Sequence, residues 1–105
     1  MIGKSRKQQL EEMLAEEPND PELRYALAME YSSAGDDEGA VQRFADLSGR
    51  HPDYVPSYYQ WAQALLRLGR PAEARPVIEK GTGRARARGD LHAAEELQGL
   101  LYTLE

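Results

Sequence analysis

The chain matches itself at a spacing of 34 residues, and this period constrains the fold more than any other feature of the sequence. Pro18 and Pro52 stand 34 positions apart, and the best internal match sets residues 21–53 against residues 55–86. A period of this length is typical of repeat proteins, in which each unit buries its apolar face only against neighbouring units. The sequence therefore predicts a row of stacked units.

Each unit is predicted to be a pair of helices. Residues 21–34 carry an apolar stripe at helical spacing, and Gly35 then supplies a C-terminal stop. Residues 38–50 form a second amphipathic helix that ends before a proline, because the residue preceding a proline resists helical geometry. The second unit repeats this order with helices over residues 56–68 and 72–88. The side chains expected to face inward are Leu27, Ala28, Tyr31, Ala40, Val41, Phe44, Leu47, Tyr58, Trp61, Ala62, Leu65, Ala74, Val77 and Ile78.

Two further helices are predicted at the ends of the chain. Residues 4–17 match the second helix of a unit whose first helix is missing, and residues 90–104 form an amphipathic helix that would cap the row. The expected inward side chains are Leu10, Met13 and Leu14 in the first and Leu91, Ala94, Leu97, Leu101 and Leu104 in the second. Gly81 stands in register with Leu47, so we expect the last helix to pack closely over this glycine.

The order of large, small and aromatic positions in both units resembles the pattern of the tetratricopeptide repeat (TPR) family. The residues that carry the resemblance are Leu27, Ala28, Tyr31, Ala40, Phe44 and Pro52 in the first unit and Tyr58, Trp61, Ala62, Leu65, Ala74 and Ile78 in the second. The chain departs from the pattern at Arg24, where tryptophan is usual, and at Arg86, where proline is usual. The resemblance implies an all-α, right-handed solenoid of antiparallel helix pairs, with about six helices in one domain over residues 1–105.

The sequence contains no residue set that points to catalysis, a cofactor or a metal. Cysteine is absent, which excludes disulfides, thiolate chemistry and cysteine-bound metals. His51 and His92 stand in no metal-binding spacing, and we expect a structural or exposed role for each. Paired carboxylates fall at helix starts and on polar faces, where capping and solvation account for them. We therefore expect that the protein is not an enzyme.

The charge distribution argues against nucleic acid and membranes as partners. The net charge is −5, with −6 in residues 1–53 and +1 in residues 54–105. This asymmetry does not suit a face that neutralises phosphates, and no apolar stretch approaches the roughly 20 residues that span a bilayer. Acidic side chains follow the first basic residues at the place where a signal peptide needs an apolar core, so we expect a cytoplasmic protein.

A second stripe of side chains remains on the first helix of each unit after the inward residues are assigned. In the TPR family this stripe lines the concave ligand groove, so the resemblance implies a peptide-binding groove here. Its residues would be Tyr25, Met29, Ser32 and Ser33 in the first unit and Tyr59, Gln63, Leu66 and Arg67 in the second. Relatives that hold a C-terminal carboxylate use groove lysines and asparagines, but these helices have neither, and Asn19 lies in a loop.

The leading hypothesis is a scaffold or adaptor module whose groove holds a peptide or helix of a partner protein. Exposed tyrosine gives a large contact area at low entropic cost, and methionine adapts its shape to a ligand. The alternative is a structural module, such as a homodimer, that pairs through its terminal helices. The last helix offers Leu100 beside its inward stripe and Leu104 at the end of that stripe, and open ends of a solenoid invite pairing.

Overall fold

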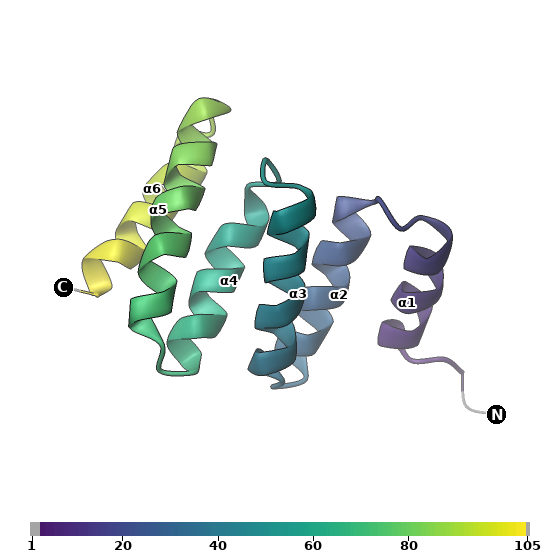
Figure 1. The fold of residues 1–105 in the computed structure, drawn as a ribbon. Helices are drawn as coiled ribbons and strands as arrows, with labels where there is room; N and C mark the ends of the chain where they lie inside the picture. Colours follow the sequence, from purple (N-terminus) through teal and green to yellow (C-terminus); the bar gives the residue numbers. More distant parts are fainter. Residues whose placement is uncertain (1–2, 105) are drawn as a thin grey trace.

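Six α-helices make up the part of the chain that the computed structural model describes, residues 3–104 (Figure 1). They are α1 (Arg6–Glu16), α2 (Pro21–Ser33), α3 (Asp37–Arg50), α4 (Pro56–Arg67), α5 (Pro71–Ala87) and α6 (Leu91–Thr103). No strand occurs among these described residues. The predicted all-α fold with six helices is confirmed.

The helices form an elongated row with two layers. Each helix packs mainly on its neighbours in the chain, and α4 also contacts α6. Figure 1 shows α3 and α5 in front of α2, α4 and α6, with α1 at the opposite end of the row from α5 and α6. The row measures 50 × 29 × 20 Å, as expected when units are added side by side instead of around one centre.

Short-range signals in the sequence fix where the helices begin and end. In four helices a side chain accepts a hydrogen bond from a backbone N–H of the first turn, namely Ser5 for α1, Asp20 for α2, Asp36 for α3 and Asp90 for α6. Proline opens α2, α4 and α5, at a position where its missing N–H has no intrahelical partner to lose. Three helices end at a glycine in the left-handed conformation, which other residues rarely adopt. These are Gly35 after α2, Gly69 after α4 and Gly89 after α5, with φ of 80°, 73° and 73°.

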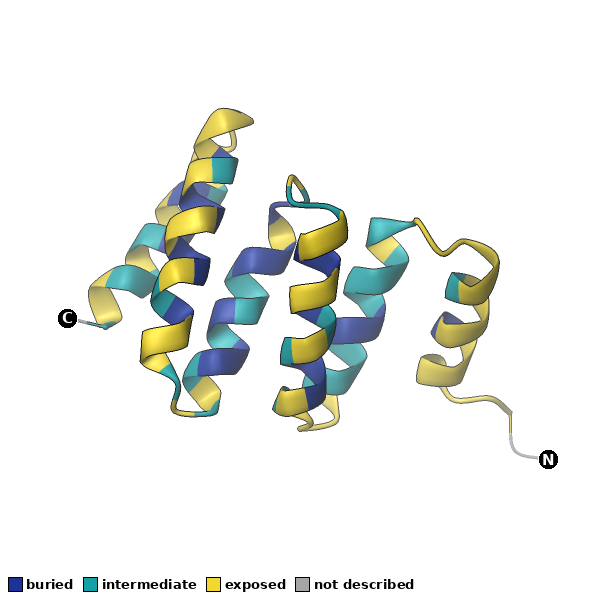
Figure 2. Ribbon diagram, in the orientation of Figure 1, coloured by how far each residue is buried: buried dark blue, intermediate teal, exposed yellow. Residues whose placement is uncertain are grey.

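The core lies along the contacts between neighbouring helices (Figure 2). Small residues let the helix backbones approach closely, and those that are fully buried include Ala28, Ala40, Ala62 and Ala74. The largest fully buried side chain is Tyr58. Its Oη donates a hydrogen bond of 2.6 Å to the Pro52 carbonyl oxygen, which satisfies the phenol without water.

Two residues predicted to face inward are exposed instead. Leu91 keeps 66% of its surface exposed and Met13 keeps 50%. Leu91 precedes the buried Leu97 by six residues, and at about 100° per residue the two side chains stand about 120° apart around α6. Met13 lies on α1, which packs chiefly on α2, so less of its surface is covered.

Gly81 marks the place where α4, α5 and α6 come close together. A methyl group in place of its hydrogen would stand 2.5 Å from Tyr58 Cβ and 3.1 Å from Leu97 Cδ1. Both of these side chains are buried in close-packed surroundings, so neither has room to move aside. The predicted packing of the last helix over Gly81 is confirmed, and α4 takes part in it through Tyr58.

We expect Gly81→Ala to lower the free energy of unfolding by about 1–3 kcal/mol, because overpacking outweighs the better helix propensity of alanine. Gly83 is the matched control, since it lies in the same helix and a methyl group there meets nothing within 4 Å. Gly83→Ala should raise the free energy of unfolding by up to about 1 kcal/mol. Urea denaturation followed by circular dichroism measures both, and a rise for both variants would contradict the tight contact at Gly81.

Candidate functional site

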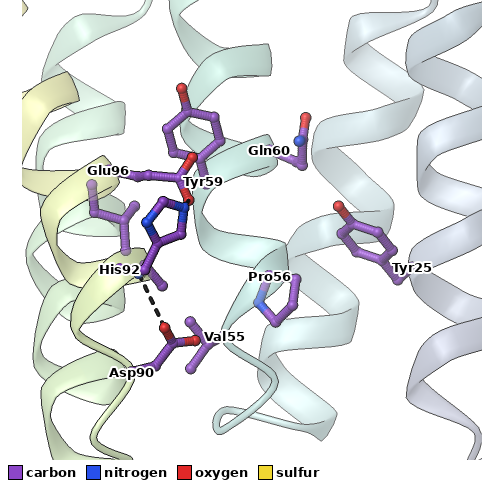
Figure 3. Close-up of a pocket in the computed structure, with 10 residues that line it drawn as sticks. Tyr25, Val55, Pro56, Tyr59, Gln60, Asp90, His92 and Glu96 are labelled. Atoms are coloured by element: carbon purple, nitrogen blue, oxygen red, sulfur yellow. Dashed lines mark hydrogen bonds and ion pairs between the residues drawn. The ribbon is translucent and has the colours of Figure 1, made fainter.

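The two tyrosines of the predicted groove border one hollow between α2, α4 and α6 (Figure 3). The hollow has a volume of about 270 Å³. Its lining consists of Tyr25 from α2, Pro56, Tyr59 and Gln60 from α4, His92, Ala93, Glu96 and Leu97 from α6, and Val55 and Asp90 from the residues just before α4 and α6. The hollow therefore lies between the first repeated unit and the last helix.

Tyr25 forms the α2 wall of the hollow. Its ring packs against the rings of Phe44 and Tyr54, with centroid separations of 6.1 and 5.6 Å. Burial raises the pKa of the Tyr25 phenol above its ordinary value of 10.0, and a hydrogen bond with the Gln60 side chain partly opposes the rise. The phenol is therefore neutral at physiological pH and offers both a donor and an acceptor.

Tyr59 and the side chains of α6 form the facing walls. Gln63 Nε2 donates a hydrogen bond of 3.2 Å to Tyr59 Oη, which leaves the phenol proton for a ligand. On α6, His92 Nε2 lies 3.4 Å from Glu96 Oε1. Asp90 Oδ1 accepts a hydrogen bond of 3.1 Å from a backbone N–H in the first turn of α6 (Figure 3). This carboxylate therefore caps α6 and borders the hollow.

Other residues of the predicted groove do not line the hollow. Met29 is half-buried and packs on the cluster around Phe44, and Leu66 is half-buried on the cluster around Tyr58. Ser33 is exposed near the C-terminal end of α2. The structure thus brings Tyr25 and Tyr59 together and spreads the remaining residues further along α2 and α4.

Arg67 and Ser32, also predicted for the groove, contact each other away from the hollow. Arg67 Nη2 donates a hydrogen bond of 3.1 Å to Ser32 Oγ, and Arg67 Nε donates one of 3.0 Å to Asp37 Oδ1. These bonds connect α4 to α2 and to the first residue of α3. The Arg67 guanidinium therefore stabilises the contact between successive helix pairs.

Sequence reasoning missed the contribution of α6 to the hollow. We predicted α6 only as a cap, yet His92, Ala93, Glu96 and Leu97 make up one of the walls. The sequence signal that points there is Gly81, because a glycine at that register lets α6 approach α4. His92 has the exposed role that we expected, with 85% of its side chain accessible.

The lining of the hollow is partly polar and partly apolar. Phenols, an amide, an imidazole and two carboxylates stand beside the apolar side chains of Val55, Pro56 and Leu97.

Within residues 3–104, no group of three or more histidine, cysteine, aspartate or glutamate side chains is arranged to hold a metal ion. None of the helices described is long and apolar enough to cross a membrane.

Comparisons with known proteins agree with this architecture. A family profile described as a tetratricopeptide repeat matches residues 4–57, just over half of the chain. The chain belongs to the tetratricopeptide repeat family. The resemblance drawn from the two repeated units is therefore confirmed.

Relatives of this TPR chain share most of its length. A TPR repeat-containing protein of Pseudomonas aeruginosa is 31% identical over 96 residues, which cover 91% of each chain. The crystal structure of a tetratricopeptide repeat domain protein from Salinibacter ruber is 33% identical, with a TM-score of 0.76 over 81% of this chain and 94% of that one. The solution structure of a protein from Bordetella parapertussis is 27% identical, with a TM-score of 0.83 over 97% of this chain and 89% of that one. The TPR fold is generally a scaffold for protein–protein interaction.

The phenols of Tyr25, Tyr54 and Tyr58, which are half-buried or fully buried, predict a loss of stability at high pH. Burial is the main cause that raises the pKa of each above 10.0. The stability that these groups contribute is fully present below about pH 10, the unfolded value, and is lost as the pH rises through the raised folded values. In an ultraviolet titration of phenolate, we expect Tyr25→Phe to remove one phenol from the part of the curve above pH 10. If the phenol lost from the curve instead titrates at its ordinary pKa near 10, or if the curve of the folded chain is identical to that of the urea-unfolded chain, this assignment is contradicted.

Proposed function

We propose that this TPR chain is a protein-binding module that holds a peptide or helix of a partner in the hollow between α2, α4 and α6. The observation that carries the proposal is that Tyr25 and Tyr59, from two successive units, line the same hollow. The family and its fold are typically non-catalytic and generally serve as interaction scaffolds. Binding, and not catalysis, is therefore the proposed role.

Both tyrosines suit the recognition of a partner segment. Each ring gives a large contact area with few rotatable bonds, so a ligand gains surface contact at low entropic cost. The two phenols add hydrogen bonds that orient the ligand over an apolar floor formed by Val55 and Leu97. In this proposal the groove continues from the hollow along α2 and α4 past Met29, Ser32, Ser33, Gln63, Leu66 and Arg67.

The same proposal treats the chain as one domain with a defined order of units. Residues 4–17 form a half repeat, residues 21–53 and 55–88 form two full repeats, and residues 90–104 form the capping helix. The groove face then consists of the first helix of each repeat together with the cap. A bound segment that crosses this face contacts both repeats at once.

Affinity capture from a cell extract tests the proposal. We expect the unaltered chain to retain a partner that the double variant Tyr25→Ala/Tyr59→Ala loses, because truncating a tyrosine at the centre of an interface costs about 2 kcal/mol or more where it is a binding hot spot. Tyr102→Ala is the matched control, since Tyr102 is 67% exposed and lies outside the hollow. This control should retain the partner.

A second variant separates loss of binding from loss of folding, because Tyr25 also packs on Phe44. His92→Trp places a large ring at the hollow from a side chain that is 85% exposed, so the core stays intact. Loss of the same partner in both variants, with unchanged circular dichroism for His92→Trp, supports the hollow as the binding site. Retention of that partner by both variants rules the hollow out.

A second candidate role is self-association through the ends of the row. The large apolar side chains exposed among the described residues are Met13 on α1 and Leu91 and Tyr102 on α6. Leu100 and Leu104, which we expected to be available for pairing, are half-buried and pack against the core. Apolar groups at the open end of a repeat array favour pairing with another end.

Sedimentation velocity distinguishes this second role. If the ends pair, the chain should associate as its concentration rises, and Leu91→Asp/Tyr102→Asp should return it to a monomer because a charge replaces each apolar contact. Gly83→Ala serves as a control that leaves both ends unaltered. A monomer at every concentration removes this candidate.

A further inference from the structure

We propose that the hollow receives a lysine or arginine side chain of the partner segment, held between the two tyrosines and the carboxylates of Asp90, which caps α6, and Glu96 on α6. This inference rests on the proposed function and names the chemistry that the site selects. The lining of the hollow contains Asp90 and Glu96 but no lysine or arginine. Its fixed charge is therefore negative, and a cation is the complementary ligand.

The two carboxylates on the α6 side of the hollow are placed to accept from a cation. Asp90 caps α6 through Oδ1, which leaves the lone pairs of Oδ2 for a further donor. Glu96 Oε1 stands 3.4 Å from His92 Nε2, and the Glu96 side chain is 47% exposed, so a ligand can reach it. Hydrogen bonds from a guanidinium or ammonium to a carboxylate are about twice as strong as bonds between neutral groups.

The tyrosine rings supply the second element of a cation site. A lysine or arginine within about 6 Å of a ring centroid gains roughly 0.5–2 kcal/mol, more as the pair is removed from water. This chain already uses such contacts, since Lys7 Nζ lies 4.4 Å and Arg43 Cζ 3.8 Å from the centroid of the Tyr31 ring. In the part of the chain described here, both cation–π contacts fall on Tyr31. Neither of these two cations lies over Tyr25 or Tyr59, the rings that line the hollow.

The surroundings of the Tyr25 wall are negative as well. Tyr54, which packs on Tyr25, has a phenol whose pKa is raised first by burial and then by the nearby carboxylates of Glu22 and Asp20. The one arginine of the predicted groove, Arg67, donates a hydrogen bond to Asp37. A cationic side chain would therefore meet the carboxylates of Asp90 and Glu96 in the hollow itself, and no arginine or lysine of the lining would oppose it.

Other ligand side chains fit the hollow less well. A carboxylate would approach Asp90 and Glu96 and be repelled by both. An apolar side chain would displace water from these carboxylates without replacing its hydrogen bonds, and such desolvation is costly. A neutral polar side chain would satisfy hydrogen bonds but gain neither the ion pair nor the full ring interaction. The contrast between arginine and its neutral isostere citrulline is therefore the sharpest probe.

Nuclear magnetic resonance titration of the full chain tests this choice with three short peptides. They have the form Gly-Gly-X-Gly-Gly, in which X is arginine, citrulline or glutamate. We expect the arginine peptide to shift the backbone resonances of Tyr59, Ala93 and Glu96 in a saturable way. The citrulline peptide should bind about tenfold more weakly, which corresponds to about 1.4 kcal/mol. The glutamate peptide should cause no saturable shift at these residues.

A matched pair of variants locates the charge that is responsible. Glu96→Gln removes a carboxylate of the hollow and should weaken the arginine peptide severalfold while leaving the citrulline peptide unchanged. Glu95→Gln is the control, since Glu95 is the preceding residue, is exposed and does not line the hollow. It should leave the affinity for both peptides unaltered. Equal effects of the two substitutions would indicate general electrostatics and would overturn the inference.

The remaining outcomes also decide the matter. Equal binding of arginine and citrulline, or no saturable shift with arginine, overturns the inference. N-acetylarginine amide that binds as tightly as the peptide would indicate a free small cation as the ligand instead of a protein segment. Shifts that depend on protein concentration alone would indicate a second copy of this chain. In each case the capture experiment with Tyr25→Ala/Tyr59→Ala still tests the proposed function by itself, so the two failures are distinguishable.

Discussion

The second half of the structure depends on the contact between Gly81 and Tyr58. Tyr58 is fully buried, and the missing side chain at Gly81 lets α5 lie against it closely enough for Leu97 of α6 to reach the same place. This junction of three helices sets α6 beside α4, a contact between elements that are not consecutive in the chain. The hollow follows from that placement, because four of its ten lining residues belong to α6.

Those parts of the fold that depend on neighbouring residues were predictable from the sequence. The repeat period and local signals such as the Asp20 cap act within one unit or one turn, so they indicate how many helices form and where. Burial was predicted correctly at the centre of an apolar stripe, as for Phe44. It was wrong for Leu91 and Met13, because exposure at the margin of a stripe or on an end helix depends on which helix lies opposite.

The candidate site was predictable only in part, for a physical reason. Tyr25 and Tyr59 occupy equivalent positions of the two units, so the stacking of units alone brings them to one face. The contribution of His92 and Glu96 depends on how the last helix returns across α4, which no local pattern specifies. Likewise, the hydrogen bond from Arg67 to Asp37 forms because successive helix pairs pack together. The stripe on which Arg67 lies did not indicate it.

The position of the hollow has a consequence for the cooperativity of the whole array. In a linear repeat protein the free energy is approximately a sum of unit terms and nearest-neighbour interface terms, so a terminal helix is able to open locally while the rest stays folded. The hollow, however, borders α2 at one side and α6 at the other. A ligand bound there would add a favourable interaction free energy that links α2 to α6, two helices that are not neighbours in the row. With a ligand bound, opening of α6 would also break the contacts between the ligand and α2. The end helix α6 would then no longer open independently of the rest of the row.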